Sequence, residues 1–131
     1  MGLKNVGSRT ITGVVNLIDV TQSTLEAAMH GASLRHTVLA GNIANANTPG
    51  YQRRDVDFQG TLREALASGA PAPAAASFTV AVDPGVVRAD GNGVNIDVES
   101  ARLAENDLAY ESLAQVARAR VDIIESAIGA R

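Results

Sequence analysis

An abrupt helix stop at Thr48-Pro49-Gly50-Tyr51 constrains the fold of this chain more than any other feature. Pro49 has no backbone N–H and disfavours helical geometry at Thr48, while Gly50 readily adopts a positive φ. Just before the stop lie three asparagines whose side-chain amides can bond to backbone groups: Asn42, Asn45 and Asn47. None of these residue types is a good nucleophile, base or metal ligand. The segment therefore predicts a structural junction, in which the extra amides are available to a neighbouring chain.

An apolar stripe before the stop predicts a helix over residues 21–46. Its members alternate spacings of four and three, the pattern of a heptad seam. They are Leu25, Met29, Ala32, His36, Leu39, Ile43 and Ala46. Gly31 and Gly41 lie inside the helix, where each costs about 1 kcal/mol relative to alanine. Either they allow another helix to approach closely, or the helix simply tolerates them.

A second stripe of the same spacing predicts a helix over residues 97–128, a stretch without proline. Its members are Leu103, Asp107, Tyr110, Ala114, Ala117, Val121, Ile124 and Ile128, and Asp107 alone is charged. Asp97 and Glu99 suit the N-terminus of this helix, because carboxylates offset the helix dipole. Gly129 is a natural stop.

The middle of the chain predicts only short elements. We expect a short helix around Thr61 to Leu66 and an Ala/Pro-rich linker over 67–77. A short strand is expected over Ser77 to Val82. A turn at 89–93, flanked by Val86 to Arg88 and Val94 to Val98, predicts a small hairpin.

The predicted fold is mainly α: two long terminal helices form a coiled-coil-like hairpin or bundle, with a small loop-rich or β excursion between them. Residues 1–18 are expected to be a flexible or partner-dependent N-terminal arm, because Gly2, Gly7 and Gly13 weaken a helix. Residues 19–131 form one domain, with a turn and irregular or β region over 47–96. Since much of the apolar content is alanine, the helices are expected to gain stability by packing against neighbouring chains.

Composition excludes several classes of protein. A net charge of −3 argues against nucleic-acid binding, and the adjacent pair Arg53 and Arg54 is interpreted as a solvated flank of the turn. The absence of cysteine excludes disulfides and cysteine-based zinc sites. No apolar run approaches the roughly 20 residues of a membrane span. The first 20 residues are too interrupted for a cleavable secretory signal.

Candidate sites for chemistry are weak. His30 and His36 are six residues apart and do not share a helix face, so His36 is predicted to be an interface residue and not a metal ligand. Residues 90–99 fail the calcium-loop pattern. Asp55 and Asp57 flank Val56 and are interpreted as an Arg-paired or solvated edge, not an acid–base pair. We expect no enzyme activity and no cofactor.

The stretch Ala40-Gly41-Asn42-Ile43-Ala44-Asn45-Ala46-Asn47-Thr48-Pro49-Gly50-Tyr51 resembles the N-terminal signature of flagellar rod, hook and related axial proteins. Within that family the short chain is most similar to proximal rod proteins. The similarity continues through Gln52-Arg53-Arg54-Asp55-Val56-Asp57-Phe58, Asp90 to Asp97, Leu103-Ala104-Glu105-Asn106 and Tyr110. It covers roughly residues 16–128.

The resemblance implies a structural subunit of the basal-body proximal rod, which polymerises through its terminal helices into a tube that transmits torque and encloses the export channel. The implied partners are copies of itself, other proximal rod proteins, the rod-base protein and membrane ring, and the flagellar type III export apparatus. The implied location is the rod in the periplasmic space, reached without a cleavable signal peptide. The competing interpretation is a cytoplasmic helical adaptor or export chaperone.

Two sets of residues carry these expectations. The family motif predicts a junction between the core helices and the rest of the subunit, at Asn42, Asn45, Thr48, Pro49, Gly50 and Tyr51. The stripes predict the surfaces that pack against neighbouring subunits, at Leu25, Met29, Leu39, Ile43, Leu103, Tyr110, Val121, Ile124 and Ile128.

Overall fold

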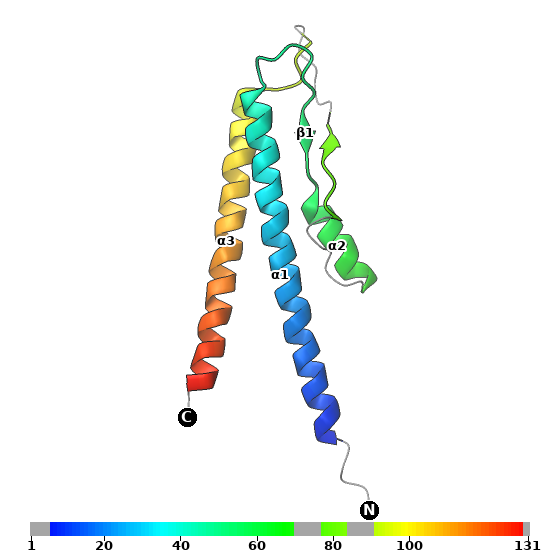
Figure 1. Cartoon of the computed structure of the whole chain (residues 1–131), viewed down its shortest axis with the longest axis vertical. Helices are drawn as coiled ribbons and strands as arrows, with labels where there is room; N and C mark the ends of the chain where they lie inside the picture. Colours follow the sequence, from blue (N-terminus) through cyan, green and yellow to red (C-terminus); the bar gives the residue numbers. More distant parts are fainter. Residues whose placement is uncertain (1–5, 70–76, 84–90, 130–131) are drawn as a thin grey trace, which may run out of the picture.

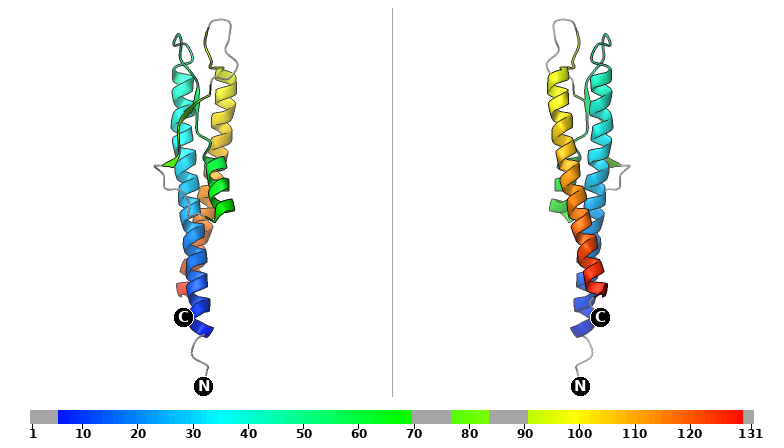
Figure 2. Two further views of the ribbon diagram at one scale, coloured as in Figure 1. Left: turned by 90° about the vertical axis from the view of Figure 1, so that its right-hand side faces the viewer. Right: turned by 90° about the vertical axis from the view of Figure 1, so that its left-hand side faces the viewer.

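Two long helices dominate the computed structural model, which describes residues 6–69, 77–83 and 91–129. Helix α1 spans Val6–Ala44 and helix α3 spans Ile96–Gly129. The helices run antiparallel, lie close together at the end where α1 stops, and separate toward the two chain termini (Figure 1). The side views show the same elongated pair (Figure 2). The prediction of a mainly α chain built on two long terminal helices is confirmed.

Helix α1 begins at Val6, much earlier than the predicted start at residue 21. Gly7 and Gly13 lie inside this helix. Each costs only about 1 kcal/mol relative to alanine, and the helix can include them because it extends from a segment that is already packed. Its end at Ala44 and the bounds of α3 differ from the predictions by two residues or fewer. The partner dependence of the N-terminal arm stays a prediction, and residues 1–5 lie outside the described residues.

A small excursion lies along one side of α1 (Figure 1). It comprises strand β1 (Arg54–Asp55), helix α2 (Phe58–Ser68) and strand β2 (Ala81–Val82). The strands pair antiparallel, with Arg54 opposite Val82 and Asp55 opposite Ala81. Only the last two residues of the predicted strand over 77–82 form a strand. Their partner, β1, follows shortly after the turn at residues 48–51.

The hairpin predicted around residues 89–93 is wrong in its second strand. Val94 and Asn95 belong to no strand, and α3 already begins at Ile96. The side chain of Asn95 explains this start, because its Oδ1 accepts hydrogen bonds from Asp97 N at 3.0 Å and Val98 N at 3.3 Å. Such an asparagine cap satisfies N–H groups that the first helical turn leaves unpaired. The other predicted strand, 86–88, and linker residues 70–76 lie outside the described residues.

Asp57 sets the start of α2 three residues before the predicted Thr61. Its Oδ1 accepts a hydrogen bond from Gly60 N at 2.8 Å, which makes it the helix cap. At the other end Gly69 adopts φ +68°, the left-handed conformation that ends many helices. Asp57 is therefore a capping residue and not half of an acid–base pair.

The apolar core lies where α2 and residue 78 pack against α1. Phe58 and Phe78 meet edge to face with ring centroids 6.3 Å apart. Gly31 allows this approach, since a Cβ there would lie 2.5 Å from the Cβ of Phe58. Of Gly31 and Gly41, Gly31 is thus the one needed for close packing, against a side chain of α2. The core comprises Ala27, Ala28, Ala32, Val56, Phe58, Leu62 and Phe78.

Candidate functional site

Asn42 lies at the centre of the junction between α1, β1 and α3, and it is completely buried. Its Nδ2 donates to the carbonyl oxygen of Arg54 at 2.7 Å and to Oε2 of Glu99 at 2.7 Å. Its Oδ1 accepts from Arg54 N at 3.1 Å and from the hydroxyl of Tyr51 at 3.2 Å. The amide is thus fully used inside its own chain. The prediction that this asparagine offers its amide to a neighbouring chain is wrong.

Glu99 connects α3 to the same junction and is also buried, at 1% exposure. Its carboxylate accepts hydrogen bonds from Asn42, from Arg53 Nε at 2.5 Å and from Arg102 at 3.2 Å. Arg53 is 4% exposed and also donates to Asp55 and Asp83. The interpretation of Arg53 as a solvated flank is therefore wrong, and Glu99 acts as the partner of a buried guanidinium.

Asp55 shares two arginines. Arg35 of α1 donates to it through Nε at 2.9 Å, and Arg53 through Nη2 at 2.8 Å. Burial alone would raise the pKa of this carboxyl, but the bonds from Arg35, Arg53 and the N–H of Val56 outweigh it and lower the pKa from 3.8 to about 2. The Arg-paired interpretation of Asp55 is confirmed. The effect is to fasten β1 to α1 through charged hydrogen bonds.

The predicted stop is a tight turn. The carbonyl of Thr48 accepts a hydrogen bond from Tyr51 N at 3.2 Å, and Gly50 has φ +72°. Proline at the second position and a positive-φ glycine at the third are typical of a type II turn. Before it, Asn45 donates from Nδ2 to the carbonyl of Gly41 at 2.8 Å and so bonds the last turn of α1. These contacts give the chain one exit direction, toward β1.

The two polar residues within the stripes face each other across the helix pair. His36 Nδ1 lies 2.8 Å from Asp107 Oδ1. The neighbouring Asn106 donates from Nδ2 to the carbonyl of Ala32 at 2.9 Å, which requires the helices to approach closely there. His36 is thus a residue of the helix–helix contact inside this chain. Among the residues that the structure describes, no cluster of three His, Asp or Glu side chains could hold a metal.

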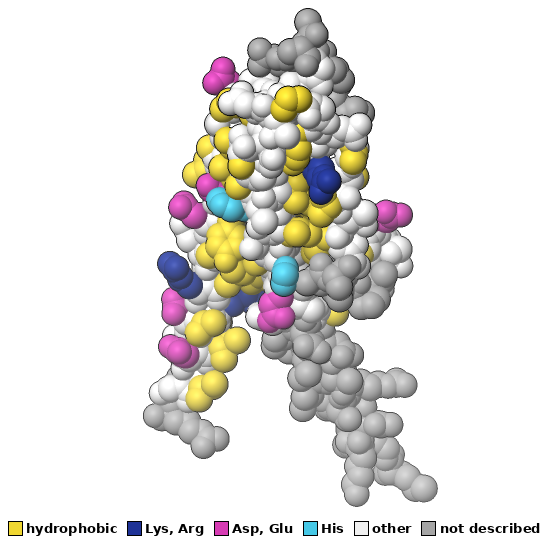
Figure 3. All heavy atoms as spheres, turned by 45° about the horizontal axis from the view of Figure 1, so that its top comes forward, with side chains coloured by type: hydrophobic (Ala, Val, Ile, Leu, Met, Phe, Trp, Pro, Cys, Tyr) yellow, Lys and Arg dark blue, Asp and Glu magenta, His cyan; other side chains and the backbone are white. Residues whose placement is uncertain are grey.

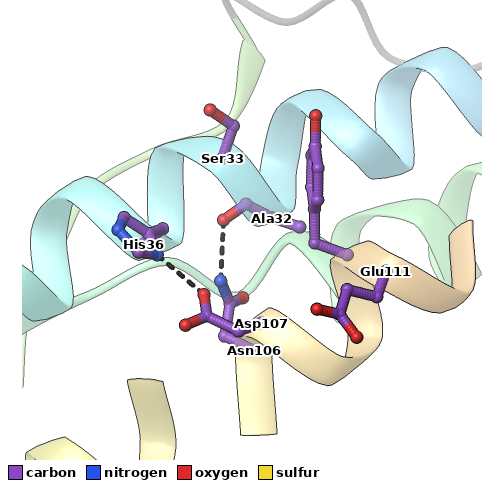
Figure 4. A pocket seen from close by; sticks show the side chains of 7 residues that line it. Ala32, Ser33, His36, Asn106, Asp107 and Glu111 are labelled. Carbon is purple, nitrogen blue, oxygen red and sulfur yellow. Dashed lines mark hydrogen bonds and ion pairs between the residues drawn. The ribbon is translucent and has the colours of Figure 1, made fainter. Parts of the chain in front are cut away.

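Beside these contacts, α1 and α3 border a cavity of about 380 Å³ (Figure 4). Four of its lining residues come from α3 and three from α1. They are Ala32, Ser33, His36, Asn106, Asp107, Tyr110 and Glu111.

The predicted stripe divides into two parts. Leu25 and Leu39 are buried in the single chain, and Met29, Ile43 and Leu103 are half-buried. These five lie in the region where α1 packs against its neighbours in the chain. Their role in contacts between subunits stays a prediction. Leu39 is completely buried, so it can affect such contacts only by stabilising the fold of its own chain.

The other part of the stripe lies on α3 and is exposed. Tyr110 is 40% exposed, Ile124 47% and Ile128 74%. Val116 and Ile123 are also large, apolar and exposed, but they lie seven residues apart on a different side of α3. We call the exposed part of the stripe beyond Leu113 the α3 apolar face: Val121, Ile124 and Ile128, which follow spacings of three and four and so lie on one side of the helix. Figure 3 shows hydrophobic side chains gathered toward the C-terminal end of α3. No helix in the described part of the chain is both long and apolar enough to cross a membrane.

Sequence reasoning missed Arg53, Glu99 and Asn106 as buried polar residues. Arg53 had one available signal, since it alternates with Asp55 beside an asparagine-rich helix end. Glu99 and Asn106 carried no such signal. Both lie outside the apolar stripes, as solvent-exposed residues also do.

Comparison with known proteins identifies the class. Residues 23–52, which hold the end of α1 and the junction turn, match the family described as flagella basal body rod protein. A flagellar basal body rod protein FlgB from Salmonella typhimurium is 32% identical over 117 residues, with 75% of this chain and 85% of the relative covered. A FlgB from Cereibacter sphaeroides is 38% identical over 105 residues, with 72% and 82% covered. The Escherichia coli FlgB is 31% identical over 117 residues.

The chain is therefore a structural protein of the flagellar basal-body rod. Within that class it belongs to the FlgB family. The relatives are named as rod proteins and not as enzymes, in agreement with the expected lack of catalytic chemistry.

Proposed function

We propose that this chain polymerises through its terminal helices into the wall of the proximal rod, a tube in the periplasmic space that transmits torque and encloses the export channel. The observation that carries the proposal is the α3 apolar face. Val121, Ile124 and Ile128 are 52%, 47% and 74% exposed and lie on one side of a long regular helix. Contiguous apolar surface of this kind is typical of protein–protein contacts, and burying a large aliphatic side chain gains about 1.5–3 kcal/mol.

The junction supports the same proposal. The buried network of Asn42, Arg53 and Glu99 fixes the angle at which α3 leaves the closed end of the hairpin. A fixed angle presents the apolar face of every copy in the same orientation, as a regular polymer requires. The motif residues Asn42, Asn45, Thr48, Pro49, Gly50 and Tyr51 would thus act inside the subunit to define its shape.

The proposed neighbours are copies of this chain, the other proximal rod proteins, and the rod-base protein that joins the membrane ring. Delivery is proposed to use the flagellar type III export apparatus without cleavage of a signal peptide. The chain would bind no nucleic acid and no cofactor.

The test is quantitative mass spectrometry of detergent-purified basal bodies from the native cells. We expect the chain at a level comparable to that of the other rod proteins. Detection only in the soluble fraction, while other rod proteins are present in the particle, would refute the rod function and favour a cytoplasmic adaptor or export chaperone.

A matched pair of variants tests the apolar face. Ile124→Asp should lower incorporation into basal bodies strongly, because it places a charge where an apolar side chain would be buried. Ser126→Asp adds the same charge two residues away, at an exposed polar position, and should incorporate normally. Equal incorporation of the two variants would argue against polymerisation through this face.

A further inference from the structure

One residue that lines the cavity between α1 and α3 has a buried polar atom without a hydrogen-bond partner among the described residues. Asn106 is 2% exposed, and its Nδ2 is committed to the carbonyl of Ala32 at 2.9 Å. That contact fixes the orientation of the amide, since only the NH2 group can donate to a carbonyl. The Oδ1 therefore faces away from Ala32, and it has no hydrogen-bond partner among the described residues. A buried acceptor in this state favours binding of a donor.

The surroundings of this atom are acidic. Asp107 and Glu111 line the same cavity, and neither lysine nor arginine does. The carboxylate of Asp107 faces His36, whereas Glu111 is exposed and has no hydrogen-bond partner in the described part of the chain (Figure 4). Spacings of four place Asn106 with Tyr110 and Asp107 with Glu111 in two adjacent rows on α3. Asn106, Asp107, Tyr110 and Glu111 thus border one space of about 380 Å³.

We propose that this cavity is a socket for an arginine side chain of a neighbouring rod subunit. A guanidinium carries several donors in one plane, so it can bond to the Asn106 oxygen and to the Glu111 carboxylate together. It also stacks on aromatic rings, which Tyr110 supplies. Lysine matches this arrangement less well, because its ammonium is a compact point charge without a planar face.

The socket differs from the α3 apolar face in position and in chemistry. It lies where the two helices are in contact, and its contribution is a directed, charged contact that fixes register between subunits. The inference rests on the proposed rod function, because the arginine is supplied by a neighbouring subunit of the assembly.

Crosslinking within assembled basal bodies tests the socket directly. A photoreactive amino acid at Ser33, an exposed residue that lines the cavity, should capture a peptide of a neighbouring subunit that contains arginine. The same amino acid at the exposed Glu64, which is outside the cavity, serves as the control and should not capture that peptide. A captured peptide without arginine, or no captured peptide in assembled particles, would overturn the proposal. The latter result would leave water as the partner of Asn106.

Charge reversal supplies a second test in cells. Glu111→Arg should lower incorporation into basal bodies by about tenfold relative to Glu64→Arg, at equal cellular level of the chain. Changing the captured arginine to glutamate should restore incorporation of Glu111→Arg. Normal incorporation of Glu111→Arg, with the wild-type chain present in the particle, overturns the socket alone. Absence of the wild-type chain from the particle refutes the rod function, and the socket with it.

Discussion

The side-chain amide of Asn42 on α1 donates a hydrogen bond of 2.7 Å to the carboxylate of Glu99 on α3, and both residues are completely or almost completely buried. This contact joins positions 57 residues apart in the chain. It also links the family motif to the start of the second long helix. Because Arg53 bonds to the same carboxylate, the turn, β1 and both helices meet at one buried charge.

Replacement of Asn42 by alanine should destabilise the chain by about 3 kcal/mol, because it removes the partner of the Arg54 N–H and carbonyl and takes one donor from the buried Glu99 carboxylate. The measurement is the free energy of unfolding in urea, followed by circular dichroism. Asn47→Ala, at an exposed position of the same turn, is the control and should change it by less than about 0.5 kcal/mol. Similar losses in both variants would contradict the central role of Asn42.

Replacing only Arg53 of the Arg53–Glu99 ion pair should lower the free energy of unfolding more than replacing both residues. Arg53→Met leaves the Glu99 carboxylate buried without its main cation, and the expected loss of stability is about 3–5 kcal/mol. Adding Glu99→Leu should recover part of that loss, since no unpaired charge then remains buried. A double variant less stable than Arg53→Met would show that Glu99 contributes mainly through Asn42 and Arg102.

Gly31 and Gly41 should respond oppositely to alanine. Gly31→Ala places a Cβ 2.5 Å from Phe58 and should cost about 1–3 kcal/mol, more than the roughly 1 kcal/mol gained in helix propensity. A Cβ at Gly41 would meet no described atom within 4 Å beyond the adjoining helix backbone, so the alanine variant should be more stable by up to about 1 kcal/mol. Thermal unfolding of the two purified variants measures the difference. Stabilisation at both positions would refute the packing argument for Gly31.

Stability should fall in acid through Asp55. Its pKa is lowered from 3.8 to about 2 in the folded chain, so the unfolded state binds a proton first as the pH falls. The resulting stabilisation is complete above about pH 4 and is lost as the pH falls through about 2, and it amounts to about 2 kcal/mol. Urea unfolding between pH 5 and pH 2 should show a weaker pH dependence for Asp55→Asn than for the wild type.

The control for this experiment is Asp97→Asn, which removes an exposed carboxyl outside the arginine network. It should keep the acid dependence of the wild type. If Asp55→Asn keeps it as well, the arginine pairing of Asp55 does not contribute to stability.

Leu39 and Ile124 are both members of the predicted stripe, but a charge at Leu39 should impair folding and a charge at Ile124 should impair only assembly. Leu39→Asp places a charge at a completely buried position, so the purified chain should lose most of its stability before assembly is tested. Ile124→Asp should leave the unfolding transition of the purified chain nearly unchanged, because Ile124 is 47% exposed. Comparable unfolding behaviour of the two variants would contradict this division of the stripe.

The sequence by itself determined the secondary structure at both ends of the chain. Heptad spacing free of proline specified the two long helices, and Thr48-Pro49-Gly50-Tyr51 specified where the first must stop. These are local effects of backbone geometry and side-chain periodicity, so they can be inferred from neighbouring residues. The start of α1 was placed too late because glycines weaken a helix without ending it.

Only the tertiary structure decided which polar residues are buried and which apolar residues remain exposed. The sequence predicts Arg53 to be a solvated flank and Glu99 to offset the helix dipole, yet both are buried because the turn carries β1 over the end of α1. The stripe of α3 reads as one continuous seam, yet the helices separate toward the termini and leave Ile124 and Ile128 exposed. Burial depends on contacts between distant segments, and the direction of the junction, not the local pattern, sets those contacts.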